Sequence, residues 1–457
     1  MSVAEQLAAR ITVTRYEDLT PEAVYWSKVA VLDTLGVTLA GATEDAPRIL
    51  YDTLELGQTR GPSLMLGTAR RLGCLDAALV NGVSSHTLDF DNTSNTMAGH
   101  MSATMIPALI AAGEAYGASG KDVLLAHAVG FETGARFGHG LNFHHHEKGW
   151  HPTSTLGVFA VTAACARLLG LSPEQTANAL GLSASLAAGI KANFGTMTKP
   201  LHAGQCARGG LMSALLSRKG FTANPNAFEH KQGFFNVFNG PGNFDAARIV
   251  ESWGEPFDVT APGAAYKLYA CCAGAHAAIE AALTLVATHG VFDPWSIERV
   301  NAWTPARRLA HTDRPQPNSA LDAKFSVQYC VARALLDGKV VFEHFEGDAY
   351  REERVCGLLP RVHAAPHKPG QFAPDNNNGA VVEVMLTDGS IHSAKVERAL
   401  GRTAQNPIPL DQLRAKFENC ASRVLGPKAV RAALHAIDRF EEVASIKEFT
   451  ALLETAA

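Results

Sequence analysis

The chain has 457 residues, of which 47% are hydrophobic, and its formal net charge is -4 with the histidines neutral. This length accommodates two or three domains with a large core, and a charge without basic excess argues against nucleic acid and anionic membranes as partners. The first residues lack the pattern of a secretory signal, and no apolar run reaches about 18 residues, so we expect a cytoplasmic protein without a membrane span.

The region from Thr20 to about Lys219 is predicted to be helical, because Ala and Leu recur at intervals of three and four residues. Thr20-Pro21 combines an N-cap residue with a proline at the first helical position, and Ser172 to Gln175 has the spacing of a capping box. Small residues gather between Ala203 and Gly210, where neighbouring backbones can approach closely. We therefore expect a compact helical bundle.

Acidic residues and histidines are concentrated where the predicted helix around Asn81 ends. We expect Asp89 or Asp91 to orient an imidazole, as carboxylates beside catalytic histidines do, and His100 to lie near the start of the next helix. The same residues, His86, Asp89, Asp91 and His100, are also plausible ligands for a divalent ion. However, the H-x-x-D-x-D spacing matches no established closed metal site, so we predict no metal.

Two basic residues each precede a proline that is predicted to open a helix, His151 before Pro152 and Lys199 before Pro200. Such a helix start carries unpaired N–H groups and about half a positive charge. The two together predict a pocket for a small polyanion such as a di- or tricarboxylate. The tract at residues 144–146 is interpreted as an exposed loop between helices rather than a metal tract, with His146 as a candidate for the pocket mouth.

Between about residues 224 and 262 the composition turns to Asn, Gly, Pro and Phe, which indicates loops. After it, helices are predicted at 273–289 and 325–336, a strand at 297–304, and strands at 380–386 and 391–396 around an Asp-Gly turn. Helical character returns from residue 410. The sequence thus predicts a mainly α fold, with an all-helical domain from residues 1–265 and 405–457 and a smaller α+β lid from residues 266–404.

The segment from Tyr266 to His276 lies at the predicted domain boundary, where ligand sites often form. Lys267 can pair there with a carboxylate. Cys271-Cys272 is the one adjacent pair among eight scattered cysteines without a C-x-x-C motif, and we expect reduced thiols. The chain has no Walker A loop, no G-x-G-x-x-G after a strand and no G-x-S-x-G elbow, so ATP, NAD and α/β-hydrolase chemistry are not expected.

These motifs together resemble the MmgE/PrpD family, also called the 2-methylcitrate dehydratase family, which includes cis-aconitate decarboxylases and iminodisuccinate epimerase. The resemblance rests on N-G-x-x-x-H-x-x-D-F-D-x-T at Asn81 to Thr93, Gly99-His100, G-W-H-P-T-S-T-L-G at Gly149 to Gly157, T-K-P-L-H-x-G at Thr198 to Gly204, and K-x-Y-x-x-C with a later histidine at Lys267 to His276. It covers nearly the whole chain and is specific for the family, though not for one reaction.

The resemblance implies a helical domain built from both chain ends, a smaller α+β lid and a homodimer that works without an organic cofactor or an iron–sulfur cluster. The family's site corresponds here to Asp89, Thr93, His100, His151, Lys199 and the segment from Lys267 to Cys272. We add His146, His202 and His276 as candidate substrate contacts. The stretch from Asn193 to Pro200 is most similar to the epimerase branch, but His146 stands where that branch has a tyrosine, and Cys272 stands where the decarboxylase branch has a histidine.

We therefore expect a cofactor-independent lyase that removes water from a hydroxy-di- or tricarboxylate such as 2-methylcitrate. His151 is the predicted general base and His100 the acid that protonates the departing hydroxide, although the two can exchange roles. Lys199 stabilises developing charge, Asp89 orients an imidazole and Lys267 binds a distal carboxylate. Alternatives are an epimerase of an iminodisuccinate-like amino-dicarboxylate, a cis-aconitate-type decarboxylase, a metal-dependent hydrolase and a non-catalytic binding protein.

Overall fold

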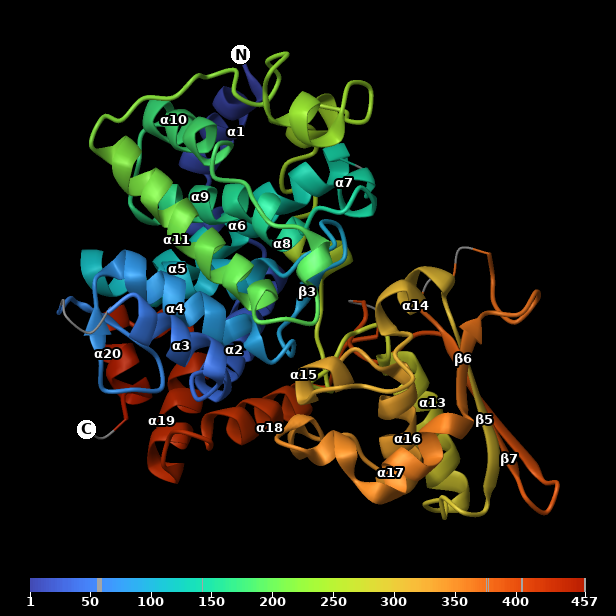
Figure 1. The fold of residues 1–457 in the computed structure, drawn as a ribbon. Coiled ribbons are helices and arrows are strands. Elements are labelled where there is room, and N and C mark those ends of the chain that lie inside the picture. Colours follow the sequence, from blue (N-terminus) through green and yellow to red (C-terminus); the bar gives the residue numbers. More distant parts are fainter. Residues whose placement is uncertain (56–59, 142, 375, 377, 404–405, 456–457) are drawn as a thin grey trace. The chain divides into compact units, whose positions relative to one another are not determined.

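The computed structural model describes residues 1–457 except 56–59, 142, 375, 377, 404–405 and 456–457. The chain divides into two compact units, the first formed by Met1–Tyr266 with Thr403–Ala457 and the second by Lys267–Arg402. The fold is mainly α-helical, as predicted, with a small mixed sheet in the second unit (Figure 1).

The first unit is a helical bundle to which both ends of the chain contribute (Figure 1). It contains α1 (Val3–Val13), α2 (Pro21–Gly41), α3 (Asp45–Thr53), α4 (Cys74–Thr87), α5 (Met101–Tyr116), α6 (Gly120–Leu141), α7 (His144–Glu147), α8 (Pro152–Thr155), α9 (Gly157–Leu168), α10 (Pro173–Ser183), α11 (Thr198–Arg218), α12 (Ala247–Val250), α18 (Leu410–Ala421), α19 (Pro427–Asp438) and α20 (Ile446–Thr450). Besides these helices it contains two antiparallel pairs of two-residue strands, β1 (Ser63–Leu64) with β2 (Arg71–Leu72) and β3 (Thr93–Ser94) with β4 (Ala264–Ala265). No helix in the described part of the chain combines the length and apolarity needed to cross a membrane.

The helix starts predicted at Thr20-Pro21 and at Ser172 to Gln175 are confirmed. Pro21 is the first residue of α2, and the Thr20 side chain accepts a hydrogen bond from the N–H of Ala23. Ser172 and Gln175 form a complete capping box at the start of α10. These signals are local, because the cap satisfies N–H groups that the helix itself leaves unpaired.

Helices α4 and α11 pack with their backbones in direct contact, which requires glycine at two positions. A Cβ atom on Gly204 would lie 2.4 Å from the carbonyl oxygen of Leu79, and one on Gly82 would lie 2.8 Å from the Cα of Gly204. The predicted close approach around Gly204 is therefore confirmed. Figure 1 shows α11, in green, beside α4, in blue, and this packing places the start of α11 near the end of α4.

The loop that follows α4 is held from two distant parts of the first unit. Lys416 on α18 places its Nζ 2.6 Å from Asp33 Oδ1 and 2.7 Å from the carbonyl oxygen of Phe90. Asp33 Oδ2 accepts hydrogen bonds from the backbone N–H and the side-chain amide of Asn92, at 3.1 and 3.0 Å. Between these anchors Asp89 has a φ of 52°, a left-handed conformation that non-glycine residues seldom adopt. The loop that contains this conformation is thus held at Phe90 and Asn92 by contacts from distant residues.

The second unit contains α13 (His276–His289), β5 (Ile297–Thr304), α14 (Ala306–Thr312), α15 (Ala320–Ala323), α16 (Val327–Asp337), α17 (Glu353–Leu358), β6 (Val362–Pro366), β7 (Ala380–Leu386) and β8 (Ile391–Val396). Its sheet has the order β6-β5-β7-β8, in which β5 and β6 are parallel and the other pairs antiparallel. The predicted strand at 297–304 and the hairpin strands at 380–386 and 391–396 are confirmed, and Gly389 in the hairpin turn has a φ of 86°. Helices α13 and α16 pack against each other and the sheet (Figure 1).

Candidate active site

Three of the predicted catalytic residues stand at helix starts in the first unit. His100 is the N-cap of α5, His151 is the N-cap of α8, and Lys199 is the second residue of α11. The backbone N–H of His100 donates to Thr153 Oγ1 at 3.0 Å, which ties the start of α5 to α8. Pro200 is the third residue of its helix rather than the first, so Lys199 lies within the first turn instead of preceding it.

Lys199 and Asp89 form a buried ion pair, with 2.5 Å between Nζ and Oδ1. Asp89 Oδ1 lies 4.0 Å from His100 Nε2, which is too long for a hydrogen bond. That Asp89 orients an imidazole stays a prediction. The shorter of these two contacts of the Asp89 carboxylate is the one to the Lys199 ammonium.

Asp91 is the carboxylate that orients imidazoles in this site. Its Oδ2 lies 2.7 Å from His100 Nδ1, and its Oδ1 lies 3.0 Å from His86 Nδ1. Burial opposes ionisation of Asp91, but the neighbouring His100 and His86 outweigh it and hold the pKa of this carboxyl well below its usual range. Asp91 is thus an anion that favours a protonated imidazole at its side.

His151 is held neutral by its surroundings. Burial, followed by the nearby His86, Lys199, His202 and His100, lowers the pKa of His151 well below its ordinary value. Its Nδ1 lies 3.1 Å from Nδ1 of the half-buried His202, whose pKa is also lowered by burial and then by His86 and Lys199. A neutral imidazole is able to accept a proton, which is what a general base requires.

Three buried polar atoms of this region have no hydrogen-bond partner among the described residues: His86 Nε2, Asn92 Oδ1 and Thr93 Oγ1. Thr93 begins β3, whose backbone pairs with β4. Buried polar atoms are usually satisfied, and an exception calls for an explanation such as a ligand. Thr93 therefore remains a suitable substrate contact.

The possible metal ligands His86, Asp89, Asp91 and His100 lie together, with their ligand atoms within 4.8 Å of one another. Their existing contacts do not suit a cation. The ammonium of Lys199 lies 2.5 Å from Asp89, and both oxygens of Asp91 face Nδ1 atoms. A divalent ion would have to compete with a fixed positive charge, so the arrangement fits an ion-pair network better than a metal centre.

The histidine tract differs from its interpretation as an exposed loop. His145 is buried in α7, with Nδ1 2.7 Å from Asn239 Oδ1 and Nε2 2.7 Å from Thr155 Oγ1. His146 is half-buried, and its Nδ1 lies 3.4 Å from Lys191 Nζ. The hydrogen-bond partner of His145 Nδ1, Asn239, is 94 residues away in the sequence. The sequence of the tract alone therefore does not predict that His145 is buried.

The remaining predicted residues, Lys267, Cys272 and His276, belong to the second unit. Lys267 and His276 are buried there, and the N–H of Cys272 donates to the carbonyl oxygen of Lys324 at 2.8 Å. His276 is the first residue of α13 and its ring lies edge-on to Tyr269. Their role as substrate contacts stays a prediction.

Three side chains join the cluster without having been predicted as site residues. His86 and Asp91 were considered only as an alternative ligand set or orienting group, and Phe194 was not considered. The Phe194 ring lies edge-on to His151, at 4.8 Å between centroids, and 5.3 Å from Lys199 Nζ. All three lie inside the segments that carry the family resemblance, which is the signal that points to them.

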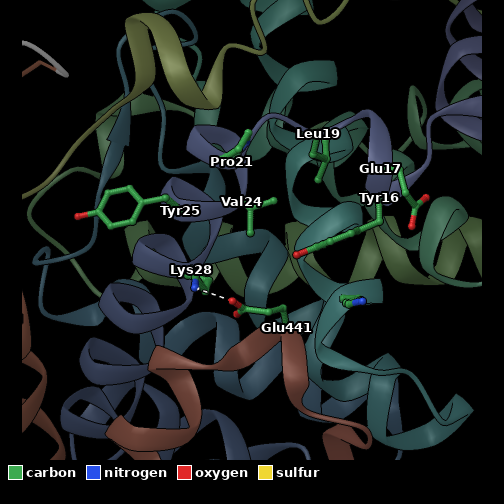
Figure 2. Close-up of a pocket in the computed structure, with 9 residues that line it drawn as sticks. Tyr16, Glu17, Leu19, Pro21, Val24, Tyr25, Lys28 and Glu441 are labelled. Atoms are coloured by element: carbon green, nitrogen blue, oxygen red, sulfur yellow. Dashed lines mark hydrogen bonds and ion pairs between the residues drawn. The ribbon is translucent and has the colours of Figure 1, made fainter.

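A cavity of about 540 Å³ in the first unit is separate from this cluster in its lining residues (Figure 2). Figure 2 shows the ammonium of Lys28 facing the carboxylate of Glu441, at 3.0 Å. The second cation, Lys121, lies 5.4 Å from the ring centroid of Tyr16. Since Glu17 and Glu441 balance the two lysines, this cavity has no charge preference for a polycarboxylate. It is lined by Tyr16, Glu17, Leu19, Pro21, Val24, Tyr25, Lys28, Lys121 and Glu441.

Comparison with known proteins agrees with the motifs. Residues 5–247 match the MmgE/PrpD N-terminal domain and residues 269–442 match the MmgE/PrpD C-terminal domain. Cis-aconitate decarboxylase from Homo sapiens is 28% identical over 463 residues, which cover 99% of this chain and 95% of that protein. Cis-aconitate decarboxylase from Aspergillus terreus is 26% identical over 474 residues, covering 94% and 92%. The 2-methylcitrate dehydratase of Salmonella typhi is 27% identical over 302 residues, covering 61% and 60%. Because the two domain matches together span most of the chain, the protein belongs to the MmgE/PrpD family.

Proposed function

We propose that this protein is a cofactor-independent lyase that removes water from a hydroxy-di- or tricarboxylate such as 2-methylcitrate. The observation that carries the proposal is that one cluster contains two imidazoles whose surroundings favour opposite protonation states. His151 is neutral, whereas His100 lies 2.7 Å from an ionised carboxylate. Elimination of water needs a base that takes a proton and an acid that gives one, and these environments supply both.

In the proposed reaction, neutral His151 takes the proton from the carbon next to a substrate carboxylate. The negative charge that develops spreads onto the oxygens of that carboxylate. His100, protonated beside Asp91, gives its proton to the hydroxyl group on the adjacent carbon, which leaves as water. A carbon–carbon double bond forms as the C–H and C–O bonds break.

Lys199 is proposed to stabilise the developing charge. An ammonium has three N–H donors, and Asp89 accepts from one of them at 2.5 Å. The ion pair holds the ammonium in place, and a preorganised donor of this kind contributes roughly a hundred- to a thousandfold in rate. The Thr93 hydroxyl is a further candidate to bind a substrate oxygen.

A screen by proton NMR in deuterated water tests the proposal. Purified enzyme is incubated with 2-methylcitrate, citrate, cis-aconitate and iminodisuccinate, and we expect a new vinylic product from a hydroxy-polycarboxylate. Deuterium exchange without a double bond would instead assign epimerisation. Absence of any change in all four compounds would contradict a lyase of this class.

Decarboxylation is the second candidate, because the decarboxylase relatives match this chain over nearly its whole length. In that case the bond to a carboxylate carbon breaks, carbon dioxide leaves, and an imidazolium protonates the carbon left behind. Release of carbon dioxide from cis-aconitate separates this outcome from dehydration. The homodimer and the cytoplasmic location stay predictions from the resemblance and the sequence.

A further inference from the structure

Asp91 fixes the tautomer of two imidazoles at once. It is fully buried, and its two oxygens lie 3.0 Å from His86 Nδ1 and 2.7 Å from His100 Nδ1. An ionised carboxylate accepts hydrogen bonds and donates none, so both Nδ1 atoms carry a hydrogen. In each ring Nε2 is therefore the nitrogen that can bind a substrate group or exchange a proton.

The two contacts to Asp91 differ in length, and His100 makes the shorter one. The proposed reaction uses His100 in its protonated form, which an adjacent carboxylate favours. In His86 the hydrogen on Nδ1 faces Asp91, so the neutral form of this ring carries its lone pair on Nε2.

This lone pair has no partner among the described residues, although His86 is fully buried. The ring lies among the other members of the site, with its centroid 4.4 Å from that of His100 and 6.0 Å from that of His151. A buried acceptor without a donor is costly, and an apolar ring of similar size would fill the same space without that cost. What is missing from His86 is a hydrogen-bond donor.

Among the groups of a polycarboxylate at neutral pH, ionised carboxylates only accept hydrogen bonds, whereas a hydroxyl group donates one. We propose that His86 Nε2 accepts a hydrogen bond from the hydroxyl group of the substrate, and that this contact selects hydroxylated polycarboxylates over those without a hydroxyl. The inference rests on the proposed function and names the residue that recognises its leaving group. His100 gives a proton to the hydroxyl oxygen as the C–O bond breaks. The water that leaves contains this proton and the original hydroxyl hydrogen, which is hydrogen-bonded to His86 Nε2.

Matched ligand pairs test this contact without requiring turnover. Citrate and propane-1,2,3-tricarboxylate differ by one hydroxyl group, as do malate and succinate. Calorimetric dissociation constants at pH 7.5 should favour the hydroxylated member by about tenfold or more in at least one pair, as expected for a site built to satisfy a buried acceptor.

In His86→Phe the preference should fall to near one through weaker binding of the hydroxylated ligand alone. His127→Phe is the matched control, because His127 is an equally buried imidazole bonded to Ser27 and Ser102 outside the cluster, and it should keep the preference. If His86→Phe does not fold, Asp91→Asn replaces it. An amide can donate to Nδ1 of His86 and place the hydrogen on Nε2, which should abolish the preference while the ring remains.

Equal binding within both pairs by the natural protein, or an unchanged preference in His86→Phe or Asp91→Asn, would overturn the inference. Failure of the proposed function has a different signature. An enzyme that forms no double bond but still prefers the hydroxylated ligand through His86 would lose its assignment as a dehydratase and keep this contact.

Discussion

Lys199 Nζ lies 2.5 Å from Asp89 Oδ1, so the cation predicted to attract a polyanion is already neutralised by a buried partner. Its expected contribution is therefore that of a fixed hydrogen-bond donor rather than a free charge. Asp91, rather than Asp89, is the carboxylate within hydrogen-bond distance of Nδ1 in both His100 and His86.

Lys199→Met should lower kcat/KM by about a hundred- to a thousandfold, because it removes a preorganised donor. It should also lower the free energy of unfolding by about 3–5 kcal/mol, since the buried carboxylate of Asp89 loses the ammonium with which it pairs. Adding Asp89→Asn should restore most of the stability but not the rate. Urea unfolding and initial rates measure the two effects, and near-normal turnover in the single variant would remove Lys199 from the mechanism.

His151→Ala should abolish turnover while the protein stays folded. The base that removes the substrate proton is then missing, so solvent deuterium should no longer enter the substrate. Proton NMR in deuterated water records both, and circular dichroism confirms the fold. Continued exchange at the natural rate would transfer the role of base to another residue.

Gly204→Ala should destabilise the protein by about 1–3 kcal/mol, because overpacking forces α11 away from α4. The added Cβ would lie 2.4 Å from a backbone carbonyl oxygen, and the displaced helix carries Lys199. Turnover should therefore fall together with stability. Gly209→Ala on the same helix is the control, since its Cβ would meet its nearest atom at 3.6 Å, and its thermal midpoint and rate should be at least those of the natural protein.

The protein should lose stability as the pH falls below about 6.5. Burial lowers the pKa of His127 to about 3 and that of His145 to about 4, both below the ordinary value of 6.5. The unfolded chain therefore binds protons first on acidification, and the stability present above pH 6.5 declines toward pH 3–4. At pH 5 the loss should be about 2 kcal/mol for each such histidine. Urea midpoints at pH 7.5 and 5 measure it, and His127→Asn should show a smaller decline.

Chelation should leave turnover unchanged. The four possible ligands around Asp91 already hold an ammonium and two imidazole N–H groups, and a divalent ion would have to displace them. Rates before and after dialysis against EDTA, with elemental analysis, measure this. A strict requirement for stoichiometric zinc or iron would overturn the cofactor-independent assignment.

The sequence predicts those parts of the fold whose causes are local. The cap at Thr20, the strand at 297–304 and the Asp-Gly hairpin follow from neighbouring residues, and each is found where expected. The close packing at Gly204 was also predicted, because the small residues around it allow a neighbouring backbone to approach the helix.

The division of labour between Asp89 and Asp91 was not predictable in this way. Asp89 has a left-handed conformation, in a loop that Asp33 and Lys416 hold from distant positions in the sequence. The burial of His145 likewise depends on Asn239. Motif spacing identifies which residues meet, but their pairing is set by long-range contacts that spacing does not encode.

The bond from Lys416 to the loop beside Asp89 has a consequence for how the protein is made. A ribosome delivers the chain from its N-terminus, so Asp33 and the loop emerge long before the lysine that fastens them. The loop beside Asp89 therefore gains its Lys416 anchor only after residue 416 has been translated. A chain that terminates before residue 416 would lack the bonds from this lysine to Asp33 and to the Phe90 carbonyl oxygen.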